Sequence, residues 1–162
     1  MSRPAPDGPR QRAFDCPEQE VYLNLWRTYD RLRALEDELF ARHDLTAQQY
    51  NTLRLLKAAH PGSVPTLGLA ARLISRAPDI TRLLDKLQER ALIDRERPAD
   101  NRRVVNVGIT EKGLALLEEL AEEVRQCHVR QLGHLQPDEM RTLIELLRKA
   151  RVPHELPESN WH

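Results

Sequence analysis

The sequence has few cysteines, no long apolar run and no excess of charge of either sign. Its two cysteines, Cys16 and Cys127, are too few for a disulfide framework and lack the spacing of metal ligands. Charged residues interrupt every apolar stretch well before the roughly 20 residues that a membrane span needs, and no stretch resembles a signal peptide. The sequence therefore predicts a cytoplasmic protein without membrane or disulfide anchorage.

Catalytic signatures are missing as well. The chain shows no Ser-His-Asp order, no phosphate-binding loop and no dinucleotide fingerprint. Glu122, Glu123 and His128 could touch a metal ion, but a polar helix surface explains these residues better. We expect no enzyme, no metal site and no cofactor.

Charge is balanced overall but unevenly spread. The 25 basic and 25 acidic residues cancel, which argues against a strongly basic coat for nucleic acid. Residues 72–103 nevertheless hold nine basic and six acidic residues, whereas residues 111–162 hold seven basic and ten acidic ones. This local excess fits a DNA reader whose other half has a different task. On charge alone, a solvated helix and hairpin would fit equally well.

Apolar residues recur at helical spacing along most of the chain, which predicts a mainly α fold. We expect helices over residues 17–43, 47–59, 67–73, the segment after Ser75, residues 111–134 and a last stretch starting at Pro137. The residues expected to cap the first turns are Thr46, Thr66, Ser75 and Thr110. Residues 1–15 are expected to form a disordered tail and residues 151–162 an irregular one.

Residues 80–109 predict a polar-faced helix followed by a basic β-ribbon. The helix buries Ile80, Leu83, Leu84 and Leu87, and its other face carries Arg76, Asp79, Arg82, Lys86 and Arg90. The first strand opens at Leu92, and Arg102 and Arg103 enter the return strand after a bend at residues 98–101. Val105, Val107 and Ile109 alternate along that strand, which places them on one face. A helix pair beside a basic ribbon can reach major groove, backbone and minor groove together.

Four motifs in this order resemble the MarR (multiple antibiotic resistance regulator) family of bacterial winged-helix regulators. They are I-T-R-L-L-D-K-L-Q-E-R at 80–90, L-I-D-R at 92–95, R-R-V-V at 102–105 and I-T-E-K-G at 109–113. The resemblance implies a winged helix-turn-helix lobe over residues 46–110, with dimerisation helices over 16–45 and 111–150. It also implies a homodimer on a palindromic operator in double-stranded DNA, acting as a repressor that a small ligand or an oxidant releases.

Two positions depart from the family pattern. Ala91 stands where the family usually has Gly, so the helix must end without the easy left-handed turn that Gly supplies, and the strand entry is expected to differ slightly. Asn101 stands where an Asp is expected, with Asp100 one residue earlier. Either the ribbon is one residue longer, or Asn replaces the Asp. The choice between Arg102 and Arg103 for the minor groove stays open.

The DNA-binding candidates divide by role. Those near the start of the reading helix are Ser75, Arg76, Asp79, Thr81 and Arg82. Arg82 can fork onto guanine, Thr81 can touch a thymine methyl or a phosphate, and Asp79 can orient an arginine or accept from cytosine. The helix starts at Thr66 and Ser75 offer free backbone donors to phosphates. For each arginine, the alternative is a surface ion pair.

The effector is less constrained. The resemblance implies aromatic acids or phenols bound between dimer base and DNA lobe, and Tyr22, Trp26, Tyr50 and Arg54 are the candidate lining residues. The alternative for the aromatic residues is a place in the dimer core. One family branch senses peroxide through a cysteine in the first helix. The matching position falls near Val21, five residues from Cys16, so oxidant sensing through Cys16 is the minor alternative. An architectural or interaction module without an effector is the remaining one.

Overall fold

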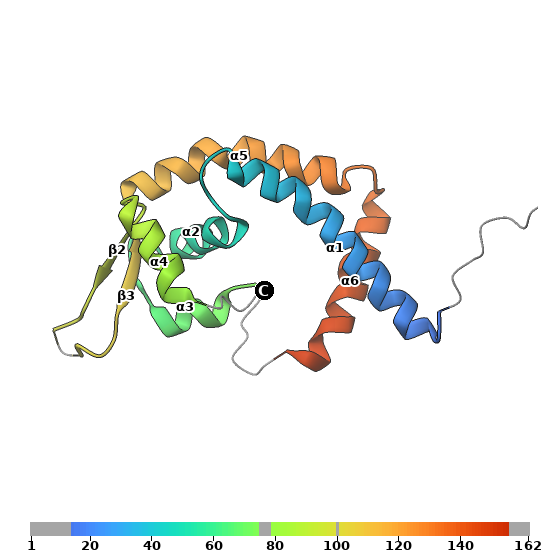
Figure 1. The fold of residues 1–162 in the computed structure, drawn as a ribbon, viewed down its shortest axis with the longest axis horizontal. Helices are drawn as coiled ribbons and strands as arrows, with labels where there is room; N and C mark the ends of the chain where they lie inside the picture. The colour runs from blue at the N-terminus through green and yellow to red at the C-terminus, as the bar shows by residue number, and fades with distance from the viewer. Residues whose placement is uncertain (1–13, 75–78, 100, 156–162) are drawn as a thin grey trace, which may run out of the picture. The chain divides into compact units, whose positions relative to one another are not determined.

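The computed structural model describes residues 14–74, 79–99 and 101–155 (Figure 1). The chain is mostly helical and carries one small antiparallel sheet. Its elements are α1 (Pro17–Ala41), α2 (Ala47–Ala59), β1 (Val64–Pro65), α3 (Thr66–Arg72), α4 (Ile80–Glu89), β2 (Ile93–Glu96), β3 (Asn106–Ile109), α5 (Glu111–Leu132), α6 (Pro137–Arg151) and the 3-10 turn η1 (Val152–His154). Two compact units divide at Leu35, so that most of α1 belongs to the first and all later elements to the second.

Local capping chemistry sets several helix starts where the sequence predicts them. The Thr46 hydroxyl accepts from the Gln49 amide, and the Gln49 side chain accepts from the Thr46 amide in return, which completes the predicted capping box. Thr110 caps α5 by accepting from the Gly113 amide at 3.1 Å. The predicted last helix begins at Pro137, as expected, where a missing backbone donor costs nothing.

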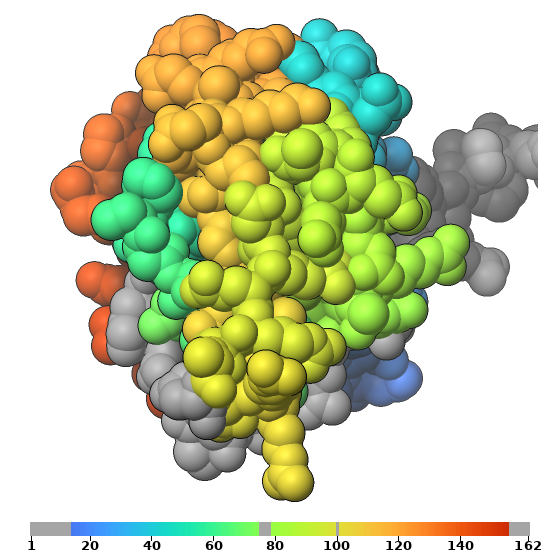
Figure 2. Space-filling model, turned by 90° about the vertical axis from the view of Figure 1, so that its left-hand side faces the viewer, coloured from blue at the N-terminus to red at the C-terminus, as the bar shows by residue number. Residues whose placement is uncertain are grey.

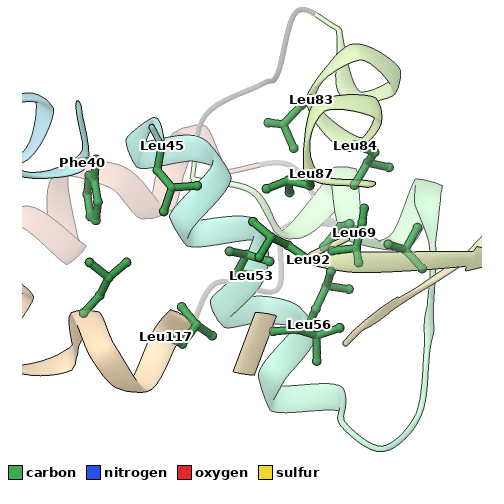
Figure 3. Packing of buried hydrophobic residues seen from close by; sticks show 14 of the residues in the cluster. Phe40, Leu45, Leu53, Leu56, Leu69, Leu83, Leu84, Leu87, Leu92 and Leu117 are labelled. Carbon is green, nitrogen blue, oxygen red and sulfur yellow. The ribbon is translucent and has the colours of Figure 1, made fainter. Parts of the chain in front are cut away.

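The core lies where α2, α3, α4, β2, β3 and α5 meet (Figure 3). Fully buried leucines come from each helix, including Leu53, Leu56, Leu69, Leu87 and Leu120. Each buried leucine contributes about 2 kcal/mol of hydrophobic stabilisation. This packing gives α2, α3, α4 and the sheet, which we call the lobe, a rigid frame on the first half of α5.

The sheet has three strands in the order β1-β3-β2, all antiparallel. Its long pair matches Ile93 with Ile109 and Glu96 with Asn106, and residues 93–109 form the wing. Sequence patterns missed β1, because its two residues, Val64 and Pro65, acquire strand geometry only by pairing with β3.

Two cap assignments were wrong. The cap of α4 is Asp79, whose carboxylate accepts from the Arg82 amide at 2.9 Å, and not Ser75, which lies outside the described residues. An acidic cap is also favoured by the positive end of the helix dipole. Thr66 lies inside α3 and caps nothing, because β1–β3 pairing brings its hydroxyl to the Val105 carbonyl, to which it donates at 3.0 Å.

The expected return strand was too long. β3 begins only at Asn106, so Arg102 and Arg103 lie in the preceding turn and not in the strand. Asn101 shapes that turn, because its side-chain oxygen accepts from the Arg103 amide at 3.2 Å. Asn101 thus closes the turn as a side-chain acceptor, while Asp100 lies outside the described residues.

Ala91 adopts the left-handed backbone conformation, with a φ of 56°. The expectation that the helix ends without a left-handed turn is therefore wrong, because the alanine itself adopts the glycine-like geometry. Left-handed backbone costs a residue with a Cβ about 1–2 kcal/mol, and this strain sits where α4 turns into β2.

Apolar residues of the last two helices differ in burial. α6 buries no residue, and its Leu143, Ile144, Leu146 and Leu147 side chains are open to solvent. In α5, Leu117, Leu120 and Val124 are buried, but half of Val129 is exposed. Across the described ranges, no helix combines the length and apolar character needed to cross a membrane.

Candidate nucleic-acid interface

α4 separates a buried face from a polar one. Leu83, Leu84 and Leu87 point into the core, whereas Thr81 and Arg82 are exposed in the first turn. The helix is therefore fastened along one side and presents its N-terminal polar residues outward. Figure 2 views the side of the molecule where α4 lies next to the projecting wing.

The predicted reading residues have different fates. Arg82 keeps its guanidinium free of hydrogen bonds to the described residues, which leaves it available to a base edge. Asp79 accepts from the Arg82 amide as the helix cap, and no arginine side chain among the described residues pairs with its carboxylate. Ser75 and Arg76 lie outside the described residues.

The wing turn is held from within. Arg97 donates to the carbonyl oxygen of Arg102 at 3.0 Å, and Val104 donates its amide to the carbonyl oxygen of Asn101 at 3.1 Å. The Arg102 and Arg103 side chains are both exposed at this turn. A turn with fixed backbone can present an arginine to a narrow groove without first paying its ordering entropy.

A hollow of about 380 Å³ lies between α3, α4 and the wing. Thr66, Thr81 and Arg103, all predicted from the sequence, line it together with Arg95 and Arg97. Three arginines line this hollow; Arg95 is paired with Asp85, and the charges of Arg97 and Arg103 give a positive potential that suits a phosphate or another anion. The hollow thus joins the predicted reading helix to the predicted wing contact.

Arg95 and Arg97 were missed as site residues. Arg95 donates to Asp85 of α4 at 2.6 Å, and its Nε is buried without a partner in the part of the chain that the structure describes. Both arginines were visible in the basic stretch; Arg95 lies in β2 and Arg97 directly follows it, and a two-residue spacing in extended chain favours the same side. That spacing was the available signal.

The end of α4 is fastened to the start of α5. The Thr110 hydroxyl donates to the carbonyl oxygen of Ala91 at 2.7 Å, and Lys112 Nζ donates to that of Arg90 at 2.9 Å. Gly113 lies against the next carbonyl oxygen, that of Leu92. The I-T-E-K-G motif is therefore a connector that supports the interface without belonging to it.

The candidate effector residues occur as two aromatic pairs. Tyr22 and Trp26 in α1 are exposed, with ring centroids 6.2 Å apart. Tyr50 stacks on Phe40 at 4.6 Å in the second unit. Burial raises the pKa of the Tyr50 hydroxyl, and the nearby positive charge of Arg54 opposes that rise.

A second hollow, of about 300 Å³, lies between the end of α1 and α5. Leu39, Arg42, Glu123, Cys127 and Arg130 are among its lining residues. Neither this hollow nor the arginine-lined one is lined by Tyr50 or Arg54. Its mixed charges single out no ligand class.

The two cysteines differ in burial, and the three candidate metal ligands each pair with other side chains. Cys16 is exposed and Cys127 is buried, and burial raises the pKa of the Cys127 thiol. Glu122 pairs with Arg125, Glu123 with Arg42 and His43, and His128 with Gln131. Among the described residues, no group of three or more such side chains could hold a metal ion.

Comparison with known proteins agrees with this geometry. The family model described as "MarR family" matches residues 45–105, which run from just before α2 to the residue before β3. A MarR transcription factor from Planctomyces limnophilus is 55% identical, with 85% of this chain and 99% of that chain covered and a TM-score of 0.67.

Two further solved structures concern DNA binding or its regulation. One is a mutant of MarR from E. coli complexed with operator DNA, 25% identical over 81% of this chain and 93% of that chain, with a TM-score of 0.73. The other is Bordetella bronchiseptica BpsR, whose DNA binding is regulated by 6-hydroxynicotinic acid. It is 27% identical over 85% of this chain and 96% of that chain, with a TM-score of 0.74.

Proposed function

Because the chain belongs to the MarR family of DNA-binding transcription regulators, we propose that it is a homodimeric repressor, released from a palindromic operator by a small aromatic effector. Members of this family regulate transcription and are not enzymes. The proposal places the protein on DNA in a bacterial cytoplasm.

The observation that carries the DNA-binding mode is the joint exposure of the α4 start and the wing. Arg82 and Thr81 supply base-reading groups, and Arg95, Arg97 and Arg103 surround an anion-sized hollow beside them. Base contacts give sequence preference, and phosphate contacts give affinity and orientation. A mutant of MarR from E. coli, in its complex with operator DNA, is one relative with DNA bound.

The dimer is supported by apolar surface that this chain does not bury. α6 exposes Leu143, Ile144, Leu146 and Leu147, and α1 exposes Val21, Tyr22 and Trp26. Contiguous exposed apolar side chains on a helix mark an interaction surface. A second copy is the partner that also explains a palindromic operator, because a two-fold dimer reads two inverted half-sites.

The effector is supported by residue chemistry and by one relative. BpsR responds to 6-hydroxynicotinic acid, an aromatic carboxylate. Arg54 has the positive charge to pair with such a carboxylate, and Tyr50, on the same helix, has ring surface to cover the aromatic part. Tyr22 and Trp26 in α1 stay candidates from the sequence. Release requires that the effector bind the DNA-free arrangement of the lobes more tightly than the bound one.

Oxidant sensing through Cys16 is the second candidate, and the exposure of this thiol favours it. A hydrogen bond from Cys16 contributes, after a backbone hydrogen bond, to lowering the pKa of the Glu18 carboxyl. The group that touches this thiol is therefore a carboxylate, whereas reactive cysteines are typically found next to cations.

One experiment tests the proposal as a whole. The purified chain selects its preferred sites from random double-stranded DNA, and its mass is measured by sedimentation at micromolar concentration. We expect a dimer and inverted half-sites whose centres lie about one DNA turn apart, roughly 34–36 Å. A monomer, or selected sites without two-fold symmetry, would overturn the dimeric-operator proposal.

Transcription from a promoter carrying the selected site then decides the sign of regulation. We expect lower transcription with the protein and recovery when an aromatic acid is added. Sequence-independent binding that no compound changes would instead support the architectural module.

A further inference from the structure

Arg90 ends the reading helix and contacts a turn that is distant in the sequence. It is the C-terminal cap residue of α4. Its Nη1 donates to the carbonyl oxygen of Asp44 at 2.6 Å, and its Nη2 donates to that of His43 at 3.2 Å. Two donors from one planar guanidinium on two successive carbonyl oxygens form a fork that the single ammonium of lysine cannot reproduce.

The turn that Arg90 grips is also held by α5. The Arg42 guanidinium lies 3.1 Å from Glu123 Oε2, and His43 Nε2 lies 3.2 Å from Glu123 Oε1. Arg90 thus holds residues 43 and 44 through their backbone carbonyl oxygens, and Glu123 holds residues 42 and 43 through their side chains, so that the two meet at His43. A continuous path of polar contacts runs from α5 through this turn to the end of α4.

The other side of the α4 end is fastened to α5 as well. Lys112 Nζ donates to the carbonyl oxygen of Arg90 itself. The C-terminal end of α4 is thus held from two directions, while Thr81 and Arg82 at its N-terminal end face outward. Arg90 thus helps to fix the C-terminal end of α4, while Leu83, Leu84 and Leu87 hold its buried side.

The length of α4 makes the direction set at its C-terminal end important for the position of the reading residues. Ten residues at 1.5 Å each give α4 a length of about 15 Å. A swing of roughly 10° at Arg90 would displace the reading end by about 2.6 Å, which is close to the rise of about 3.4 Å between base pairs. A small change in helix direction at Arg90 therefore moves the reading residues by nearly the distance that one base pair adds to the half-site separation.

We propose that Arg90 is a positioning residue that sets the direction of the reading helix and thereby the half-site spacing that the dimer accepts. The proposal rests on the dimeric operator binding proposed above. Arg90 touches no DNA, and acts through the turn at residues 42–44 and through Glu123.

The test uses four DNA duplexes. One carries the site that the wild-type protein selects, two carry that site with its half-sites one base pair closer or farther apart, and one carries a single half-site. Arg90→Met removes the forked donors and keeps an apolar stem, and Arg90→Lys keeps the charge. Glu123→Gln weakens the far end of the path. Glu119→Gln, an exposed carboxylate one turn earlier in α5, is the matched control.

We expect wild type and Glu119→Gln to prefer the selected spacing by about tenfold or more. In Arg90→Met and Glu123→Gln this preference should fall to about threefold or less, while single-half-site affinity is unchanged. Arg90→Lys should also lose most of the preference. The double variant Arg90→Met with Glu123→Gln should lose little more of the spacing preference than either single variant, because both changes interrupt one path.

An unchanged spacing preference in Arg90→Met overturns the proposal. An equal loss of affinity for all three spacings and for the single half-site also overturns it, because that result indicates a merely structural role. If Arg90→Met does not fold, Arg90→Lys and Glu123→Gln decide by the same ratio. A failed operator proposal is recognised separately, because the wild-type chain would then select no two-fold site.

Discussion

A methyl group at residue 113 would lie 2.3 Å from the carbonyl oxygen of Leu92, so only glycine fits where α5 passes the end of α4. The same methyl group would lie 2.7 Å from Cγ1 of Ile109, which is itself buried. The close approach lets Thr110 and Lys112 reach the carbonyl oxygens of Ala91 and Arg90. A glycine in a helix thus serves the contact between two elements.

Gly113→Ala should lower the free energy of unfolding by about 3 kcal/mol, because two buried neighbours must move. Chemical denaturation monitored by circular dichroism measures this change. Gly68→Ala is the control, since its new methyl group would meet nothing closer than Val64 Cγ1 at 3.8 Å. That change should raise stability by about 0.5–1 kcal/mol through helix propensity. Equal effects of the two substitutions would contradict the close-approach argument.

Ala91→Gly should stabilise the protein. The left-handed backbone at Ala91 costs more than the extra chain entropy that glycine brings to the unfolded state, so we expect a gain of about 0.5–1 kcal/mol. Ala115→Gly, on the exposed side of α5, should instead lower stability by about 1 kcal/mol. Thermal denaturation of both variants checks the opposite signs, and a destabilised Ala91→Gly would count against the strain at residue 91.

The helices of this fold could be read from the sequence because their signals are local. The Thr46 and Thr110 caps and the Pro137 start each depend on residues within one turn. Strand β1 could not be read, because Val64 and Pro65 pair with a strand forty residues later. The hydroxyl of Thr66 was misassigned for the same reason, since its partner, Val105, is brought to it only by that pairing.

The candidate site was recovered in part. Periodicity placed Thr81 and Arg82 on the polar face of α4. It did not show that Arg95 and Arg97 turn toward the same hollow, because that depends on how the wing packs against the helix. The role of Asp79 was missed because Ser75 and Asp79 are both good caps, and sequence alone did not rank them.

Arg82→Ala and Arg103→Ala should weaken DNA binding in different ways. Removing Arg82 should relax sequence preference at one base position of each half-site, at a cost of about 1–3 kcal/mol on the preferred site. Removing Arg103 should weaken binding to all sequences and reduce the slope of log affinity against log salt by about one unit per subunit. Titrations on selected and random duplexes at several salt concentrations measure both effects. Equal loss on both duplexes for Arg82→Ala would argue against base reading.

Trp26→Ala and Arg54→Ala should blunt release by an aromatic carboxylate more than they affect DNA binding itself. The physical reason is that one supplies ring surface and the other a positive charge for the effector. Operator affinity is measured with and without a panel of aromatic acids and phenols. Variants that respond like wild type would remove these residues from the effector site.

Peroxide is the competing stimulus, and Cys16→Ser separates the two. Cys127 should react little, because its thiol is buried and burial raises its pKa. We expect release by aromatic acids to survive in Cys16→Ser. The oxidant mechanism would replace the ligand mechanism under two conditions. Peroxide must release the wild-type protein but not Cys16→Ser, and no aromatic compound must release either protein.

The surface of α6 and the polar face of α4 lie in different parts of the chain, and α6 places no residue in the core. On the proposed dimer, a chain altered at Arg82 keeps its pairing surface and still joins unaltered chains. In a cell that makes both kinds of chain, most assemblies then contain at least one subunit that cannot read DNA. Mutations in the reading helix should therefore be genetically dominant, whereas mutations that destabilise the folded chain, such as Gly113→Ala, should be recessive.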